Sequence, residues 1–416
     1  MSVADRWHKS RPKAGEAKCK CRPAKVPTAE HGQGKRWQVR WRDETGTAQK
    51  LNFETKPAAE SKDAEIKASL DRGDYVDPQA GKVTLEACAR QWRSGLTGDP
   101  GSLMITDSSL SKWVYGKPIG QQTMGLLAKR PSLVQAWIKD MEAAGLQPNT
   151  IRGHLGVVSL VFDTALDDGM VGRNPCKVKS VRPPARVRHK VVPWTLERVE
   201  AVAAALPDPY SAMTYLGSGC GHRQGELFGI ALDDIDFLAR LVHVRRQVRI
   251  INGELVFSPP KGGKVRTAPL PDAIGLRLSA HIADHPPVAV TLPWVERGKP
   301  NGAPVTASIL FPNPAGEAWN RNRFNKVWRD ALVEVGVKPG RDNGCHALRH
   351  TAASAWLAAG VDIRTVAEFL GHSDPGFTLR TYTHLMPDAS DRARKAMDLF
   401  FASVPSALVV PSEVIN

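Results

Sequence analysis

Six polar side chains in the second half of the chain have the chemistry to act together on a phosphate ester. They occur in the order Arg223, Lys261, His346, Arg349, His372 and Tyr382. A guanidinium group can bind two phosphate oxygens at once and keeps its charge at physiological pH. A tyrosine hydroxyl is an oxygen nucleophile, and histidine and lysine transfer protons. Each position alone is a weak signal, because charged helix faces are normally solvent faces, but the ordered set is specific.

The motifs around these residues are more informative than the residue types. Arg223 lies in Gly-His-Arg-Gln-Gly-Glu, Lys261 precedes two glycines, His346 and Arg349 form His-x-x-Arg, and Tyr382 follows a Leu-Gly-His box. On these motifs the chain resembles the tyrosine recombinases, the phage-integrase family, over essentially its whole length. Two positions depart from the family pattern without affecting the chemistry: His222, where an apolar residue is more common, and Ala347, where Asp is common.

The resemblance implies a reaction at a DNA phosphodiester. Tyr382 would be the nucleophile, and His346 could accept its proton. Arg223 and Arg349 would bind the non-bridging oxygens, where charge is spread as the phosphorus becomes five-coordinate. Two arginines can replace a metal ion in this role, so we expect no metal at the catalytic site.

Three further roles follow from the same resemblance. Lys261 would be the general acid that protonates the departing 5′-oxygen, and His372 would hydrogen-bond the phosphate. Glu226 would orient an arginine rather than react. The product would be a 3′-phosphotyrosine, and rejoining would exchange one ester for another. We therefore expect no ATP requirement and no cofactor.

The expected partners are double-stranded DNA attachment sites, and the family implies a homotetramer on DNA. Accessory excision or DNA-bending factors would fit the integration or excision of a phage or mobile element. Two other functions remain open at this point. A type IB topoisomerase would relax plasmid that lacks an attachment site, and a non-catalytic DNA-binding protein would form no covalent adduct with a nicked oligonucleotide.

Composition agrees with a nucleic-acid partner. The chain has 416 residues, which predicts two or three domains, and 57 Lys+Arg against 42 Asp+Glu give a formal charge of +15. The six cysteines lack the density of a disulfide scaffold, and no apolar run reaches the length of a membrane span. We therefore expect a soluble cytoplasmic protein at the bacterial nucleoid, with no membrane partner.

The catalytic residues need a mixed domain, expected at 194–400. Asn252-Gly253 between two apolar runs predicts a β-hairpin, and a third strand follows at about 265–270. Helical periodicity dominates elsewhere, so the domain is expected to be mainly α with one small antiparallel sheet. Residues 286–305 resemble an extra loop. The apolar tail at 401–416 is a candidate for docking onto a neighbour or for packing within the same chain.

A helical core-binding (SAM-like) domain is expected before it, at 84–180. Stripes at helical spacing include Trp137, Ile138 and Met141, and then Ile151, Leu155, Val158 and Phe162. The segment 181–193 is expected to be an extended basic linker that follows a phosphate backbone. Its DNA-contacting candidates are Arg182, Arg186, Arg188 and Lys190.

The multidomain chain is expected to begin with a small β-sheet plus helix at 34–75, which the family resemblance implies is an arm-type DNA-binding module. Alternation places Trp37, Val39 and Trp41 on one face of a strand, and Arg36, Arg40 and Arg42 on the other, from which they could enter a DNA groove. Residues 1–33 are polar and basic, which predicts a flexible arm. Cys19 and Cys21 have one intervening residue, so that even with His8 and His31 they form a poor zinc set by spacing.

Overall fold

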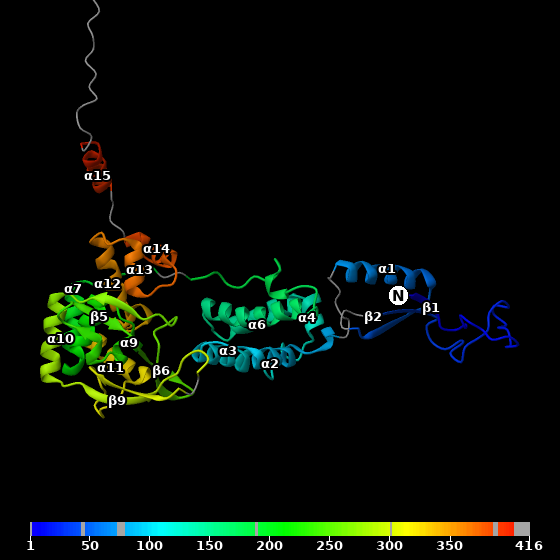
Figure 1. Ribbon diagram of the computed structural model, residues 1–416, viewed down its shortest axis with the longest axis horizontal. Helices are drawn as coiled ribbons and strands as arrows, with labels where there is room; N and C mark the ends of the chain where they lie inside the picture. Colours follow the sequence, from blue (N-terminus) through cyan, green and yellow to red (C-terminus); the bar gives the residue numbers. More distant parts are fainter. Residues whose placement is uncertain are drawn as a thin grey trace, which may run out of the picture. The chain divides into compact units, whose positions relative to one another are not determined.

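A computed structural model of the chain describes residues 2–42, 46–72, 80–187, 190–299, 302–385 and 390–402. The chain divides into two compact units, residues 1–97 with 105–187 and residues 98–104 with 188–416 (Figure 1). Within the described ranges, no helix combines the length and apolar character that a membrane crossing requires. The first unit contains two separate hydrophobic cores.

The first of these cores lies under a three-stranded antiparallel sheet in the order β1-β2-β3. The elements are β1 (Ser2–Asp5), β2 (Trp37–Arg42), β3 (Ala48–Phe53) and helix α1 (Lys56–Arg72). Val3, Val39 and Leu51 lie opposite one another in register and pack with Ile66 of α1. Because side chains alternate along a strand, α1 covers one face of the sheet and Arg40 is exposed on the other.

The expectation of a flexible arm at residues 1–33 is wrong. Its first residues form β1, which pairs with β2, and the loop between the two strands is held by backbone hydrogen bonds. The amide of Lys9 donates to the carbonyl of Val26 at 2.9 Å, and the amide of Thr28 donates to that of Trp7 at 2.9 Å. A four-residue strand whose partner is 35 residues away leaves little local signal in a polar, basic sequence.

The second core is built by helices. They are the 3-10 helix η1 (Ala80–Lys82), α2 (Leu85–Gly95), α3 (Pro100–Trp113), α4 (Met124–Lys129), α5 (Ser132–Ala143), α6 (Pro148–Asp167) and the 3-10 helix η2 (Pro175–Lys177). The hydroxyls of Thr84 and Thr123 cap α2 and α4 by accepting backbone N–H bonds. The apolar stripes predicted around Trp137 and Leu155 are buried in this core.

The first part of the basic linker is attached to these helices. The amide of Arg182 donates to Oε1 of Gln135 at 2.6 Å, and Nε of Arg152 donates to the carbonyl of Pro184 at 2.7 Å. The residues Arg182, Arg186 and Lys190 are exposed. Arg188, also predicted to contact DNA, lies outside the described residues. The linker thus has no regular secondary structure at 181–187, yet its backbone has fixed partners.

The second unit carries most of the remaining helices. They are α7 (Leu196–Ala205), η3 (Asp208–Tyr210), α8 (Ser211–Cys220), α9 (Gln224–Gly229), η4 (Leu232–Asp234), α10 (Asp272–Asp284), α11 (Arg321–Glu334), η5 (Arg341–Asn343), α12 (His346–Ala358), α13 (Ile363–Leu370), α14 (Pro375–Tyr382) and η6 (Thr383–Leu385). Phe228, Phe324 and Trp328 lie in the large core that α7, α8 and α11 share. A smaller core joins α12, α13 and Tyr382.

Among the described residues of this unit, the strands form three small antiparallel sheets rather than one. They are β4 (Ile235–Asp236), β5 (Leu241–Val244) and β8 (Arg266–Pro269) in one sheet, the hairpin of β6 (Gln247–Ile251) and β7 (Glu254–Ser258), and the pair β9 (Val288–Pro293) and β10 (Pro304–Ile309). The third strand expected beside the hairpin pairs with β5 instead. The segment 286–305, expected to be a loop, contributes β9 and the start of β10.

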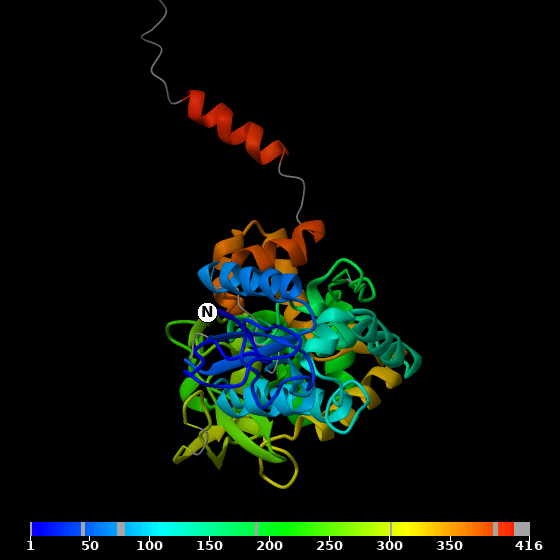
Figure 2. The same ribbon diagram turned by 90° about the vertical axis from the view of Figure 1, so that its right-hand side faces the viewer.

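Helix α15 (Ser390–Ala402) is the red helix in Figure 2. Its residues Leu399, Phe400 and Phe401 are exposed. The rest of the apolar tail, residues 403–416, lies outside the described residues. A docking role for this tail therefore stays a prediction.

Candidate active site

Tyr382 ends helix α14 with its side chain buried. Only 1% of the residue is exposed, and its hydroxyl lies 2.7 Å from Nδ1 of His350 on α12. Burial raises the pKa of Tyr382 to about 12, although the positive charges of Arg349 and Arg223 act in the opposite direction. Burial lowers the pKa of His350 to about 4, so its imidazole is neutral at pH 7 and can accept the phenol proton.

Arg349, one turn along α12 from the helix start, is also buried. Its Nη1 donates to the carbonyl of Gly221 at 2.7 Å, and its Nη2 donates to the carbonyl of Leu370. The guanidinium therefore connects the end of α8 with the end of α13. Burial and the neighbouring charges of Arg223 and Arg266 lower the pKa of Arg349. A guanidinium starts so far above neutrality that it keeps its charge.

Glu226 connects two arginines on different elements. Its Oε1 accepts from Nη1 of Arg223 at 2.9 Å, and both of its oxygens accept from Arg266 on β8, at 2.8 and 2.6 Å. The carboxylate also caps α9, because Oε2 accepts the amide of Arg223 at 2.8 Å. Burial alone would raise the pKa of Glu226, but the hydrogen bonds and charge of Arg266 and the charge of Arg223 lower it well below its usual range. Glu226 is thus an ionised carboxylate shared by Arg223 and Arg266.

Two glycines permit this arrangement of carbonyls and guanidiniums. Gly221 and Gly371 end α8 and α13 in the left-handed conformation, with φ of 70° and 62°. A Cβ at Gly371 would lie 2.9 Å from Cδ of Arg266. Gly371 therefore has no room for a side chain, and its carbonyl accepts from Nη2 of Arg223 at 3.4 Å.

The two predicted histidines lie in different surroundings. His372 is half-buried after α13, and its Nδ1 is 2.7 Å from Oγ1 of Thr378, a fully buried residue of α14. Burial and the charge of Arg349 lower the pKa of His372 to about 3. His346 is exposed at the start of α12, and its ring meets that of His350 edge-on at 4.7 Å between centroids. It is His350, and not His346, that contacts the Tyr382 hydroxyl.

Lys261 stands apart from this network. It lies on the turn between β7 and β8, where Gly262 and Gly263 adopt positive φ of 85° and 73°. In the described part of the chain, the Lys261 side chain is exposed and forms no hydrogen bond or ion pair. The structure thus brings Arg223, Arg349, His372 and Tyr382 together and leaves Lys261 on a turn free to meet a ligand.

His222 is an uncharged residue among these charges. It is 1% exposed, and neither ring nitrogen has a hydrogen-bond partner among the described residues. Burial and then the charge of Arg266 lower its pKa to about 3. Its imidazole therefore occupies an apolar position as a neutral group, which agrees with the apolar residue that the family pattern favours there.

Sequence reasoning missed two residues of this site, Arg266 and His350. Each had a signal. His350 follows Arg349 directly and lies four residues after His346, so all three project from one region of α12. Arg266 begins a predicted strand, and a buried arginine needs a carboxylate partner, here Glu226.

Among the residues predicted to contact DNA through the N-terminal sheet, Arg40 and Arg42 are exposed. Arg36 instead directs its guanidinium to the Asp5 carboxylate, with an Nη2 to Oδ2 distance of 2.7 Å. The same region contains the four residues considered as metal ligands. His8, Cys19, Cys21 and His31, judged a poor set by spacing, have ligand atoms within 4.8 Å of one another.

Comparisons with known proteins agree with this geometry. Residues 186–388 match the Phage integrase family. The chain is 26% identical over 385 residues to a tyrosine recombinase XerC-like protein of Caldanaerobacter subterraneus subsp. tengcongensis, covering 86% of this chain and 94% of the relative. It is 24% identical over 344 residues to the integrase of Mycobacterium phage D29, covering 79% and 84%.

Solved structures share the fold. The Tn1549 transposon integrase in complex with a circular intermediate DNA matches with a TM-score of 0.62 at 19% identity, covering 76% of this chain and 99% of that chain. A lambda integrase tetramer bound to a Holliday junction matches with a TM-score of 0.53 at 15% identity, covering 84% and 92%. Both likenesses concern a multidomain, largely helical fold with small antiparallel sheets.

Proposed function

We propose that this chain is a tyrosine recombinase of the phage integrase family, whose model matches residues 186–388, and that Tyr382 is the residue with which it cuts and rejoins DNA. The enzyme is a site-specific recombinase that acts in the integration or excision of mobile elements. One observation carries the assignment of its site. Arg223 and Arg349 both bind backbone carbonyls of residues 370–371, and both charges act on the hydroxyl of buried Tyr382.

The two guanidiniums supply the positive charge that the reaction needs. Attack on a phosphodiester spreads negative charge over the non-bridging oxygens, and donors fixed in advance stabilise it most when no reorganisation is required. The carbonyls of Gly221, Leu370 and Gly371 hold the two arginines in place, as does Glu226. Each guanidinium carries five N–H donors, more than these contacts use. His372, next to this pair, adds a neutral donor.

The proton of the Tyr382 hydroxyl must leave as the oxygen attacks phosphorus. His350 is placed to take it, because its neutral Nδ1 is 2.7 Å from that oxygen. The new Tyr–O–P bond forms as the bond from phosphorus to the DNA 5′-oxygen breaks. That 5′-oxygen takes a proton from Lys261, whose turn between two strands can approach the DNA backbone.

The intermediate is a 3′-phosphotyrosine with a free 5′-hydroxyl. A 5′-hydroxyl of a partner strand attacks it and regenerates the Tyr382 hydroxyl, so that one ester replaces another. The balance of bonds requires no ATP. The two arginines supply the charge at the phosphate, so this step also requires no metal ion at the catalytic site.

Double-stranded DNA is the partner, and the three parts of the chain divide its recognition. We assign arm-site binding to 34–75, core-site binding to 84–180 with the linker 181–193, and catalysis to 194–400. Exposed Arg40, Arg182, Arg186 and Lys190 would contact phosphates or a groove. Exchange of four strands requires four protomers, as in the lambda integrase tetramer on a Holliday junction.

Tyr382→Phe tests the assignment directly. The ring keeps its packing, so folding and DNA binding should persist at a cost of about 1 kcal/mol for the lost hydrogen bond. Covalent capture on a nicked suicide substrate should disappear. Tyr210→Phe is the matched control, because Tyr210 is also buried and donates to the carbonyl of Pro312 at 3.1 Å. An adduct in Tyr382→Phe, or its loss in the control alone, refutes the assignment.

A further inference from the structure

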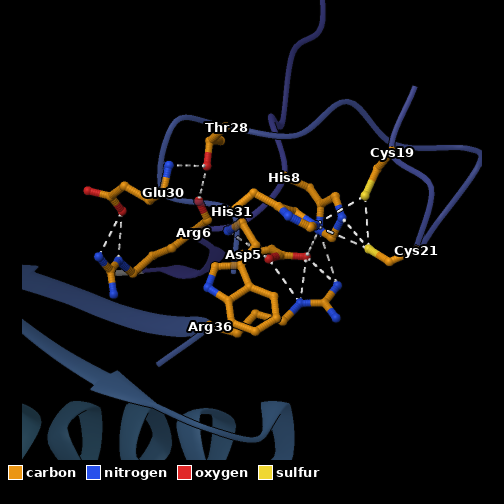
Figure 3. A network of polar contacts seen from close by, with 10 residues as sticks. Asp5, Arg6, His8, Cys19, Cys21, Thr28, Glu30, His31 and Arg36 are labelled. Atoms are coloured by element: carbon orange, nitrogen blue, oxygen red, sulfur yellow. Dashed lines mark hydrogen bonds and ion pairs between the residues drawn. The ribbon is translucent and has the colours of Figure 1, made fainter. Parts of the chain in front are cut away.

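Two thiols and two imidazoles meet at the end of the N-terminal sheet (Figure 3). Sγ of Cys19 lies 2.9 Å from Sγ of Cys21, and both sulfurs contact Nε2 of His31, at 3.1 and 3.2 Å. Nε2 of His8 lies 3.5 Å from Sγ of Cys21. The four atoms thus converge on one point although they come from three separate places in the chain.

The surrounding residues hold these side chains in position. Nδ1 of His8 is 2.9 Å from Oδ2 of Asp5, so the opposite ring nitrogen faces the thiols. The Asp5 carboxylate is itself bound by the Arg36 guanidinium (Figure 3). A carboxylate that orients a histidine through its second nitrogen is the usual outer partner of a metal-bound imidazole. The proposed recombination chemistry uses none of these residues.

Backbone contacts fix the loop that carries the cysteines. The amide of Cys19 donates to the carbonyl of Lys25 at 2.7 Å, and that of Lys25 donates to Arg22 at 2.9 Å. His8 and Cys19 are buried, His31 is half-buried and Cys21 is exposed. The site is therefore a closed turn at the surface rather than a cleft, with all four ligand atoms directed inward.

Two cysteines and two histidines match the ligand set of structural zinc. Zinc–sulfur bonds of about 2.3 Å at a tetrahedral angle place two sulfurs roughly 3.8 Å apart. The observed 2.9 Å is shorter by less than 1 Å, so small side-chain rotations would admit the ion. It is also well beyond the length of a disulfide, and both cysteines are free.

We propose that His8, Cys19, Cys21 and His31 bind one zinc ion that stabilises the N-terminal module. Four protein ligands leave no open position, which indicates a structural ion. The module has reason to need one, because its fully buried core comprises Val39, Trp41, Ala59 and Ile66. Cores of this size are commonly supplemented by a metal or disulfides.

The ion would act on the surface assigned to arm-site DNA. It would close the loop between β1 and β2, and β1 pairs with β2 so that Ser2 lies opposite Arg40. Loss of zinc should free that loop and strand β1. The face of the sheet that α1 leaves open should then lose its ordered structure. The active site, in the other compact unit, should remain intact. The zinc proposal thus stands independently of the catalytic assignment.

Zinc content of the full-length chain is the first test. Protein purified under reducing conditions with added zinc and then dialysed should contain one zinc per chain by atomic emission. The double variant Cys19→Ala/Cys21→Ala and the single variant His31→Ala should lose it. Cys176→Ala, which removes a free cysteine of η2, is the matched control and should retain it. Cobalt substitution should give the absorption of a tetrahedral thiolate site in the parent and the control alone.

A second variant guards against misfolding. Asp5→Asn keeps all four ligands but weakens the orientation of His8, so zinc affinity measured by chelator competition should fall about 10- to 100-fold. Chelator should speed proteolysis at the lysines of the β1–β2 loop and weaken arm-site binding. Cleavage of a core-site suicide substrate should stay within about twofold. The proposal is overturned if the parent binds no stoichiometric zinc, if the cysteine variant retains it, or if a Cys19–Cys21 disulfide forms while zinc is present.

Discussion

The hydroxyl of Tyr382 and Nδ1 of His350 are 2.7 Å apart, so the proposed nucleophile has a neutral imidazole in direct contact. Both groups come from helices that share one small core, α12 and α14. On the proposed mechanism, this contact makes His350 the proton acceptor or the residue that positions the hydroxyl. Either role requires the imidazole at this distance.

Substitution His350→Asn should slow single-turnover cleavage by about 100-fold or more, the usual contribution of a positioned general base. DNA affinity and the thermal midpoint should change little. Cleavage of a nicked suicide substrate under enzyme excess is the measurement, with His285→Asn, directly after α10, as the control. A larger loss of cleavage rate in His346→Asn than in His350→Asn would mean that His346 is the proton acceptor.

Replacing either Arg223 or Arg349 with lysine should preserve DNA binding and abolish most cleavage. In Arg223→Lys and Arg349→Lys the charge remains but the fork that binds two oxygens at once is lost, at a cost of roughly 100- to 1000-fold in rate. Gel-shift affinity measured over a salt series should keep the parent slope. Arg364→Lys, in an exposed pair with Glu368, is the control. Parent-like cleavage in both variants would rule out the proposed binding of phosphate oxygens by these two arginines.

Glu226→Gln should destabilise the catalytic domain because it leaves two arginines without their shared carboxylate. Removing one partner of a buried ion pair costs about 3 to 5 kcal/mol, and here Arg223 and Arg266 would also repel each other. Urea unfolding of the full-length protein measures the loss. Glu368→Gln removes an exposed carboxylate and should change the free energy of unfolding by less than about 1 kcal/mol. An equal loss of unfolding free energy in the two variants would contradict the stabilising role of Glu226 between the two arginines.

The motifs predicted four residues that the structure brings together, and the reason is physical. Arg223, Arg349 and Tyr382 are proposed to act on the substrate, so chemistry would dictate their types and order, which can be recognised in the chain. Arg266 and His350 act on other side chains of this protein, and their contacts exist only after folding brings separate elements together. Spacing along the chain likewise did not show that Cys19 and Cys21 lie close to His8 and His31.

For the fold too, features with a local sequence pattern could be predicted, and features that depend on distant contacts could not. Periodic helices such as α5 and α6 were predictable because their apolar stripes are local and each buries one face. Strand β1 and the pairing of β8 with β5 were not, because a short strand becomes stable only through a partner distant in sequence. The segment 286–305 was misjudged for that reason too.

His222→Leu should make the protein less sensitive to acid. A neutral buried histidine with a folded pKa of about 3 takes up a proton on unfolding below its ordinary pKa of about 6.5, so stability falls as pH decreases. The loss approaches about 1.4 kcal/mol per pH unit below 6.5 and ends near the folded pKa. Leucine removes this dependence and also the two unpaired ring nitrogens.

Unfolding free energies of parent and His222→Leu at pH 5 and pH 8 give the comparison. The variant should be at least as stable at pH 8 and gain a clear advantage at pH 5. Because the other histidines of the site are unchanged, the difference between the two proteins isolates His222. An advantage that does not grow toward acid pH would mean that His222 is protonated in the folded protein.

The burial of Tyr382 bears on unwanted DNA breaks. With 1% of its surface exposed, the proposed nucleophile has no access to a phosphodiester that merely collides with the protein. On the proposed assignment, the hydroxyl must therefore be uncovered when DNA binds, and a protomer whose Tyr382 is buried cannot cut.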